Sequence, residues 1–159
     1  MKEGDERVHV LIAEINDDLR AIKEIEERIN ELYRSLEGGN VTDKDKAALG
    51  YYLHNLYNAC ESILKMIAGF FENSVEGARW HTDLLRRMTL EIEGIRPSVL
   101  SKDSYSLLNE LRKFRHLFRH AYDYELRWKK LNDLVEEYKR EKGNFLQDME
   151  KIKRLLDQL

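Results

Sequence analysis

The spacing of apolar residues near the start of the chain predicts one long helix over residues 5–36. Apolar positions recur there at steps of four and three, which gives a narrow seam of the coiled-coil type. The double glycine Gly38-Gly39 follows the seam and predicts the end of the helix, because glycine readily terminates helices. The seam consists of Val8, Ile12, Ile15, Leu19, Ile22, Ile25, Ile29, Leu32 and Leu36.

A second helix is predicted over residues 43–72. Thr42 is a suitable N-cap, and Asp45 three residues later forms a weak capping box with it. The apolar residues of this segment return at helical intervals and predict one buried face, made of Leu49, Leu53, Leu56, Cys60, Ile63, Ile67 and Phe70. A buried thiol at Cys60 would be inert.

Three further helices complete the predicted architecture, an all-α antiparallel bundle of about five helices in a single domain over residues 1–159. One is expected over residues 77–91 and another from 101–103 into the basic segment described below. The last, over 124–158, repeats the four-and-three register of the first. Lys142 fills one slot of that register, which continues past Gly143 and therefore favours a continuous or only kinked helix. We expect the long first and last helices to pack along each other.

Charge is distributed unevenly along the 159 residues. Residues 1–37 hold 6 Lys/Arg and 11 Asp/Glu, whereas residues 112–130 hold 7 Lys/Arg and 2 Asp/Glu. An acidic helix and a basic patch therefore coexist, and the patch would attract phosphates. No apolar run reaches the length of a membrane span. The first residues are charged and are not followed by the apolar run of a signal peptide, so we expect a cytoplasmic protein. The lone Cys60 forms no intramolecular disulfide.

The basic region Arg112–Tyr122 carries the most suggestive chemistry. Arg115 is followed after four residues by His120 and then by Tyr122. Metal-free RNA cleavage needs a group that moves a proton near neutral pH and a fixed cation for the phosphorane charge. On an ideal helix, however, His120 lies about 140° around from Arg115. Either the helix breaks near His120 or a second subunit supplies the complementary group.

Two simpler interpretations compete with a catalytic one. The segment is equally consistent with a solvated basic helix face that carries two surface histidines. His116 and His120 also have a spacing that can bind zinc. No carboxylate or cysteine occupies a matching position nearby, and Arg115 and Arg119 would repel a cation. We therefore expect no metal and no cofactor.

The second predicted helix contains an unusually polar and aromatic stretch: Tyr51, Tyr52, His54, Asn55, Tyr57, Asn58 and Glu61. Asn55, Asn58 and Glu61 are candidates for hydrogen bonds with Arg115 or Arg119 of the basic region. A packed interface with satisfied polar groups explains the same stretch equally well.

Taken together, these motifs resemble the HEPN superfamily and, within it, HepT-like ribonuclease toxins. The resemblance covers about residues 40–159, while residues 1–37 form an additional helix. It is carried by Tyr52–Ala59 with Glu61, Trp80-His81 with Leu84, Leu85 and Met88, Arg96-Pro97, and Phe114-Arg115-His116 with Arg119, His120 and Tyr122. It implies an all-helical homodimer whose motif lines the dimer cleft, with metal-independent endoribonuclease activity.

The resemblance also implies site residues and a partner. Arg115 and His120 would act on the scissile phosphate, and Arg112, Lys113 and Arg119 would steer RNA. His116 is a rival to His120, because the most similar branch centres on the motif Phe-Arg-His. Relatives are usually encoded beside a minimal nucleotidyltransferase antitoxin, which adenylylates a tyrosine matched here by Tyr122, with Tyr124 as a second candidate.

Two other functions remain open from the sequence. A non-catalytic HEPN module that binds a nucleotide or a partner would explain the basic patch equally well, since a fold does not guarantee a chemistry. A structural bundle whose long outer helices mediate assembly is the third hypothesis.

Overall fold

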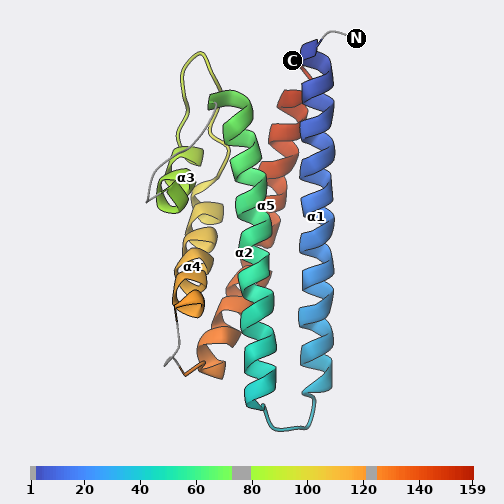
Figure 1. The fold of residues 1–159 in the computed structure, drawn as a ribbon, viewed down its shortest axis with the longest axis vertical. Coiled ribbons are helices and arrows are strands. Elements are labelled where there is room, and N and C mark those ends of the chain that lie inside the picture. The colour runs from blue at the N-terminus through green and yellow to red at the C-terminus, as the bar shows by residue number, and fades with distance from the viewer. Residues whose placement is uncertain (1–2, 73–79, 121–124) are drawn as a thin grey trace.

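The computed structural model describes residues 3–72, 80–120 and 125–159 and confirms the predicted all-α class (Figure 1). Its five helices are α1 (Glu3–Ser35), α2 (Asp43–Glu72), α3 (Trp80–Met88), α4 (Lys102–Arg119) and α5 (Trp128–Leu156). Within the described residues, extended pairing is limited to one isolated bridge between Ile92 and Arg96. No described helix is both long enough and apolar enough to span a bilayer.

The α1–α2 hairpin follows from local sequence signals. Gly38 adopts a φ of 75°, the left-handed conformation that favours glycine, in the turn after α1. The predicted capping box is present: Asp45 Oδ2 accepts from the Thr42 amide at 2.8 Å, and Thr42 Oγ1 accepts from the Asp45 amide at 3.2 Å. The predicted start of α2 is therefore confirmed, and α2 extends to Glu72, the last described residue before the gap at 73–79.

The predicted limits of α3 and α5 need correction. The helix predicted over 77–91 ends at Met88, and residues 77–79 lie outside the described part of the chain. The last helix was predicted from residue 124, which also lies outside it, but α5 begins only at Trp128 because Arg127 has an extended backbone. α5 continues unbroken through Gly143, as the hydrophobic register indicated.

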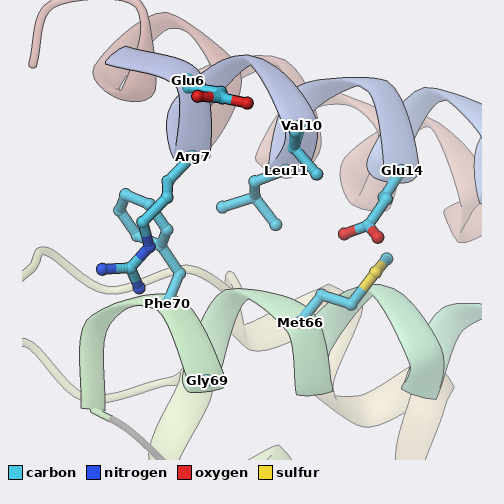
Figure 2. A pocket seen from close by; sticks show the side chains of 8 residues that line it. All are labelled: Glu6, Arg7, Val10, Leu11, Glu14, Met66, Gly69 and Phe70. Atoms are coloured by element: carbon cyan, nitrogen blue, oxygen red, sulfur yellow. The ribbon is translucent and has the colours of Figure 1, made fainter. Parts of the chain in front are cut away.

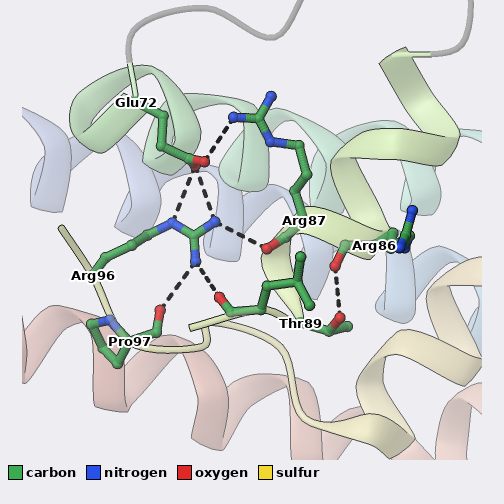
Figure 3. A network of polar contacts seen from close by, with 7 residues as sticks. Glu72, Arg86, Arg87, Thr89, Arg96 and Pro97 are labelled. Carbon is green, nitrogen blue, oxygen red and sulfur yellow. Dashed lines mark hydrogen bonds and ion pairs between the residues drawn. The ribbon is translucent and has the colours of Figure 1, made fainter. Parts of the chain in front are cut away.

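The early end of α3 is held by one buried arginine (Figure 3). The Arg96 guanidinium donates to the carbonyl of Arg87 in the last turn of α3, at 3.0 Å, and to that of Leu90 just after the helix, at 2.8 Å. It also donates to Glu72 Oε2 twice, each at 3.1 Å, while Arg87 donates to Glu72 Oε1 at 2.8 Å. Glu72 therefore ties the end of α2 to the end of α3.

The start of α4 is anchored on α5. Ser101 is the N-cap, and its hydroxyl and amide both donate to Asp148 Oδ2 at 2.9 Å. Asp148 is buried, and its negative charge lies at the helix end that favours an anion. This contact orients α4 and therefore the basic residues at its other end.

α2 is the central helix of the bundle and packs against each of the other four (Figure 1). α1 lies on one side of it and α3 and α4 on the other, and within the described residues α1 contacts neither of those two. The core between the helices is apolar and includes Ile15, Leu53, Leu56, Ile63, Leu84, Leu111 and Met149.

α1 and α5 run beside each other, as expected, although α1 packs more extensively on α2. Polar side chains join the pair at three levels. Tyr33 donates to Asn132 at 2.7 Å, the Tyr138 hydroxyl donates to Glu26, and Lys153 donates to Asn16 at 3.0 Å. The register between the two helices is therefore set by hydrogen bonds as well as by the apolar seam.

Candidate functional site

The basic segment, here residues 112–120, forms the last two turns of α4 and its C-cap. α4 ends at Arg119, and His120 leaves the helix with φ −108° and ψ 11° while its amide donates to the Leu117 carbonyl at 3.3 Å. The predicted break near His120 is therefore confirmed. Tyr122 and Tyr124, the predicted modification sites, lie outside the described residues.

Arg115 turns towards α2 rather than into solvent. Its guanidinium carbon lies 5.7 Å from the centroid of the Tyr57 ring, a cation–π distance, and the side chain is half-buried. Burial, followed by the charge of Glu61, raises the pKa of Tyr57, although Arg115 and Arg112 act in the opposite direction. Tyr57 is therefore a neutral phenol under the arginine.

His116 and His120, the rival catalytic histidines, are neighbours. Both are exposed, and their ring centroids lie 4.8 Å apart with the rings tilted by 56°. No hydrogen bond or ion pair in the described part of the chain joins either ring to Arg115. The structure thus brings the two histidines together and directs Arg115 to a different neighbour.

The predicted RNA-steering cations differ in their surroundings. Arg112 donates twice to Asn109 Oδ1, at 3.2 and 3.0 Å, and Lys113 pairs with Glu110 at 3.1 Å. Both partners belong to α4 itself, and surface pairs of this kind contribute little to stability. Arg119 is exposed at the end of the helix. All three cations therefore remain available to an incoming phosphate.

The predicted supporting residues on α2 differ in burial. Asn55 and Asn58 are half-buried, and among the described residues neither forms a hydrogen bond with Arg115 or Arg119. Glu61 is only 6% exposed, and its charge acts on Tyr57. A direct role for these three side chains at a phosphate stays a prediction.

His54 belongs to this region but was not selected from the sequence. Its ring lies 5.7 Å from that of Phe118, which approaches α2 closely because Gly50 has no side chain. Burial, then the charges of Arg115 and Arg119, lower the pKa of His54 below its ordinary value. In the sequence, the only sign of a role for His54 is its position among polar and aromatic residues of α2. The side chains that act on it belong to α4, so the sequence could not identify them.

The described residues contain no group of three or more histidine, cysteine, aspartate or glutamate side chains arranged to hold a metal ion. His116 and His120 are therefore a pair without a third ligand in that part of the chain. The chemistry available at the end of α4 is that of imidazoles and guanidiniums, which suits proton transfer and binding of an anion.

A separate hollow of about 470 Å³ lies between the start of α1 and the end of α2 (Figure 2). Its walls are apolar at Val10, Leu11 and Met66, and Arg7 lies 5.5 Å from the centroid of the Phe70 ring at one end. Since α1 makes no contact with α4 in the described chain, this hollow is distinct from the basic segment.

Comparison with known proteins gives a match to a family model. No curated protein and no solved structure is similar to the chain at a significant level. The family model described as "HepT-like protein" matches residues 48–156, roughly two thirds of the 159 residues, and this match includes α3, α4, α5 and most of α2. On this match, the chain belongs to the HepT-like family.

Proposed function

We propose that this protein is a metal-independent endoribonuclease toxin with its active site at the basic segment of α4. The observation that carries the proposal is the pair of exposed imidazoles, His116 and His120, 4.8 Å apart at the end of a helix that also presents Arg115 and Arg119. Membership of the HepT-like family supports the same conclusion.

The proposed reaction is an internal transesterification. One imidazole, with His120 ranked first, takes the proton of a ribose 2′-hydroxyl as its oxygen attacks the adjacent phosphorus. A second imidazole gives a proton to the 5′ oxygen as the phosphorus–oxygen bond breaks. Arg115 stabilises the charge of the pentacoordinate phosphate, and Arg112, Lys113 and Arg119 attract the RNA backbone. The products are a 2′,3′-cyclic phosphate and a 5′-hydroxyl.

We propose further that the site is completed in a homodimer. Within one chain, Arg115 faces Tyr57 whereas the histidines face solvent. Leu117 is 39% exposed in the middle of the basic segment, and Tyr51 is 53% exposed on α2. Apolar and aromatic side chains that are exposed beside the basic segment favour an interface with a second copy of the chain. The second copy would add its own cations and imidazoles to the site.

The proposed partner is a minimal nucleotidyltransferase that acts as antitoxin. It would transfer the adenylyl group of ATP to the phenol of Tyr122, or of Tyr124, and release pyrophosphate. The phosphate added there carries a negative charge and would offset the cations of the basic segment, because it lies within two or four residues of His120. This modification is a prediction from the family.

Cleavage of RNA by the purified protein in EDTA tests the proposed function. We expect His120→Ala or His116→Ala to lower the rate about 10²- to 10⁴-fold, the usual contribution of a general acid or base. His9→Ala, on the exposed face of α1, serves as the matched control and should cleave at the wild-type rate. End-group analysis should find cyclic phosphate.

The assignment of the histidines is wrong if both single variants retain full cleavage. Absence of cleavage by the wild-type protein, with RNA or nucleotidyltransferase binding retained and dependent on Arg119, would instead favour the non-catalytic binding module. Charge reversal at Arg115 and Arg119 without any effect on binding or toxicity would favour a structural bundle.

A further inference from the structure

Buried polar atoms without a hydrogen-bond partner are concentrated at one place in the bundle. Within the described residues, the side-chain atoms of this kind are His54 Nδ1, the Tyr57 hydroxyl and Arg115 Nε. The Tyr57 hydroxyl has Glu61 as a neighbour, which raises its pKa through its charge and a side-chain hydrogen bond. Since buried polar groups are nearly always paired, the other two atoms, which lie at one contact between α2 and α4, call for a functional explanation.

The three residues occupy facing surfaces of the two helices. His54 and Tyr57 are three residues apart on α2 and so share a face, and Arg115 lies over the Tyr57 ring. Phe118, one turn after Arg115, packs on the His54 ring. His54 and Arg115 are half-buried as residues, so each encloses one polar atom while part of the residue remains exposed to solvent.

The charges that act on His54 are positive, whereas Glu61 acts on the neighbouring Tyr57. They are the guanidiniums of Arg115 and Arg119, both from α4. Burial and these two cations lower the pKa of His54, which favours the neutral imidazole. Two cations and a neutral imidazole with an available N–H form a set of donors that suits an anion.

We infer that His54, Arg115 and Arg119 form a phosphate-binding site between α2 and α4 that receives a phosphodiester group of RNA. The identity of the ligand as RNA rests on the proposed function. The inference adds His54 of α2 to a site otherwise built on α4. A phosphate at this position accepts hydrogen bonds from both guanidiniums and from the imidazole. Its charge also offsets the two cations, which raises the proton affinity of His54.

The direct test is to follow the histidine ring signals by NMR while an uncleavable 2′-O-methyl RNA is added. The pKa of His54 should rise when the RNA binds, because the phosphate counteracts Arg115 and Arg119. The signal of His9 provides an internal control, since this residue is exposed on α1, which does not contact α4. Inorganic phosphate alone should produce a smaller shift in the same direction. An RNA complex in which the His54 signal and pKa do not change would overturn the inference.

Affinity measurements give a second, independent test. His54→Gln should weaken binding of the uncleavable RNA about tenfold, the usual effect of losing one hydrogen bond to a charged group. His9→Gln should bind as the wild type does. Because a change at the half-buried His54 can disturb folding, Arg119→Gln at an exposed position provides another variant. It should raise the pKa of His54 in the free protein and weaken RNA binding. Unchanged affinity in both variants contradicts the inference.

These experiments distinguish failure of the proposed phosphate site from failure of the proposed nuclease activity. If the protein does not cleave RNA but the His54 signal responds to it, the catalytic proposal fails and the phosphate site stands. If cleavage occurs while His54→Gln leaves RNA affinity and the pH dependence of cleavage unchanged, the phosphate site fails and the nuclease proposal stands.

Discussion

Glu72 is the residue on which two arginines converge. Its side chain is 5% exposed, that of Arg96 is fully buried, and that of Arg87 is 38% exposed. Removal of one partner from a buried ion pair leaves the other charge uncompensated in a medium of low polarity. Glu72 therefore stabilises the fold chiefly by matching Arg96, which in turn holds the carbonyls at the end of α3.

We expect Glu72→Gln to lower the free energy of unfolding by about 3–5 kcal/mol, the usual effect of breaking a buried pair. Denaturant titration measures this quantity. Glu93→Gln, an exposed carboxylate on the connection between α3 and α4, is the control and should change stability by less than about 0.5 kcal/mol. Equal effects of the two substitutions would contradict the role assigned to Glu72.

Lys142 departs from the hydrophobic pattern of α5. It occupies an apolar slot in the hydrophobic register of α5, and its ammonium lies 3.2 Å from Glu26 Oε2 on α1. The Tyr138 hydroxyl donates to the same carboxylate. Glu26 is more than a hundred positions away in the chain, so no local pattern could have identified it as the partner of Lys142.

At the scale of the elements, the contact between α2 and α4 depends on a glycine. A Cβ atom at Gly50 would lie 2.8 Å from Cε2 of Phe118. The Phe118 ring cannot simply retreat, because it is stacked on Phe114 with centroids 5.7 Å apart and contacts His54. Gly50 thus allows α4 to bring its basic segment close to α2.

We expect Gly50→Ala and Gly69→Ala to change stability in opposite directions, although both glycines lie within α2. Alanine favours a helix by about 1 kcal/mol over glycine. At Gly69, where an added Cβ meets no atom within 4 Å, this gain should appear in full. At Gly50, overpacking against Phe118 costs about 1–3 kcal/mol and should outweigh it. Thermal unfolding measures the change in stability of each variant, and stabilisation by both substitutions would refute the proposed contact.

At the scale of the whole molecule, α1 is the helix that the family match leaves out. The match begins at residue 48, yet α1 contributes buried side chains to the single core. These are Val8, Leu11, Ile15, Ile22 and Ile29. We infer that α1 is part of the folded unit, because without it the facing sides of α2 and α5 would be exposed.

Deletion of residues 1–37 should abolish cooperative folding. Five buried apolar side chains at about 1.5–3 kcal/mol each contribute roughly as much as the whole net stability of a domain, about 5–15 kcal/mol. Circular dichroism and thermal unfolding would report the loss. Replacement of the exposed Glu24, Glu27 and Glu31 by glutamine removes charge but little apolar surface, and this control should fold normally. A shortened chain that melts like the full one would disprove the structural role of α1.

Most of the fold could be predicted because its signals are local. The capping box at Thr42, the left-handed Gly38 and the register through Gly143 each depend on residues within one or two turns. The misplaced end of α3 shows the limit of such local signals. Its carbonyls are held by Arg96, which lies beyond the helix and is itself fixed by Glu72 from α2.

For the candidate site, the sequence alone determined which residue types gather at the end of α4, since four cations and two histidines lie close together in the sequence there. Only the tertiary structure decided the direction of Arg115, which faces Tyr57 of α2. It also brought His54 beside Phe118 and within reach of the charges of Arg115 and Arg119. The reason is physical: helical periodicity determines which side chains share a face, whereas the packing of α2 on α4 determines which faces meet.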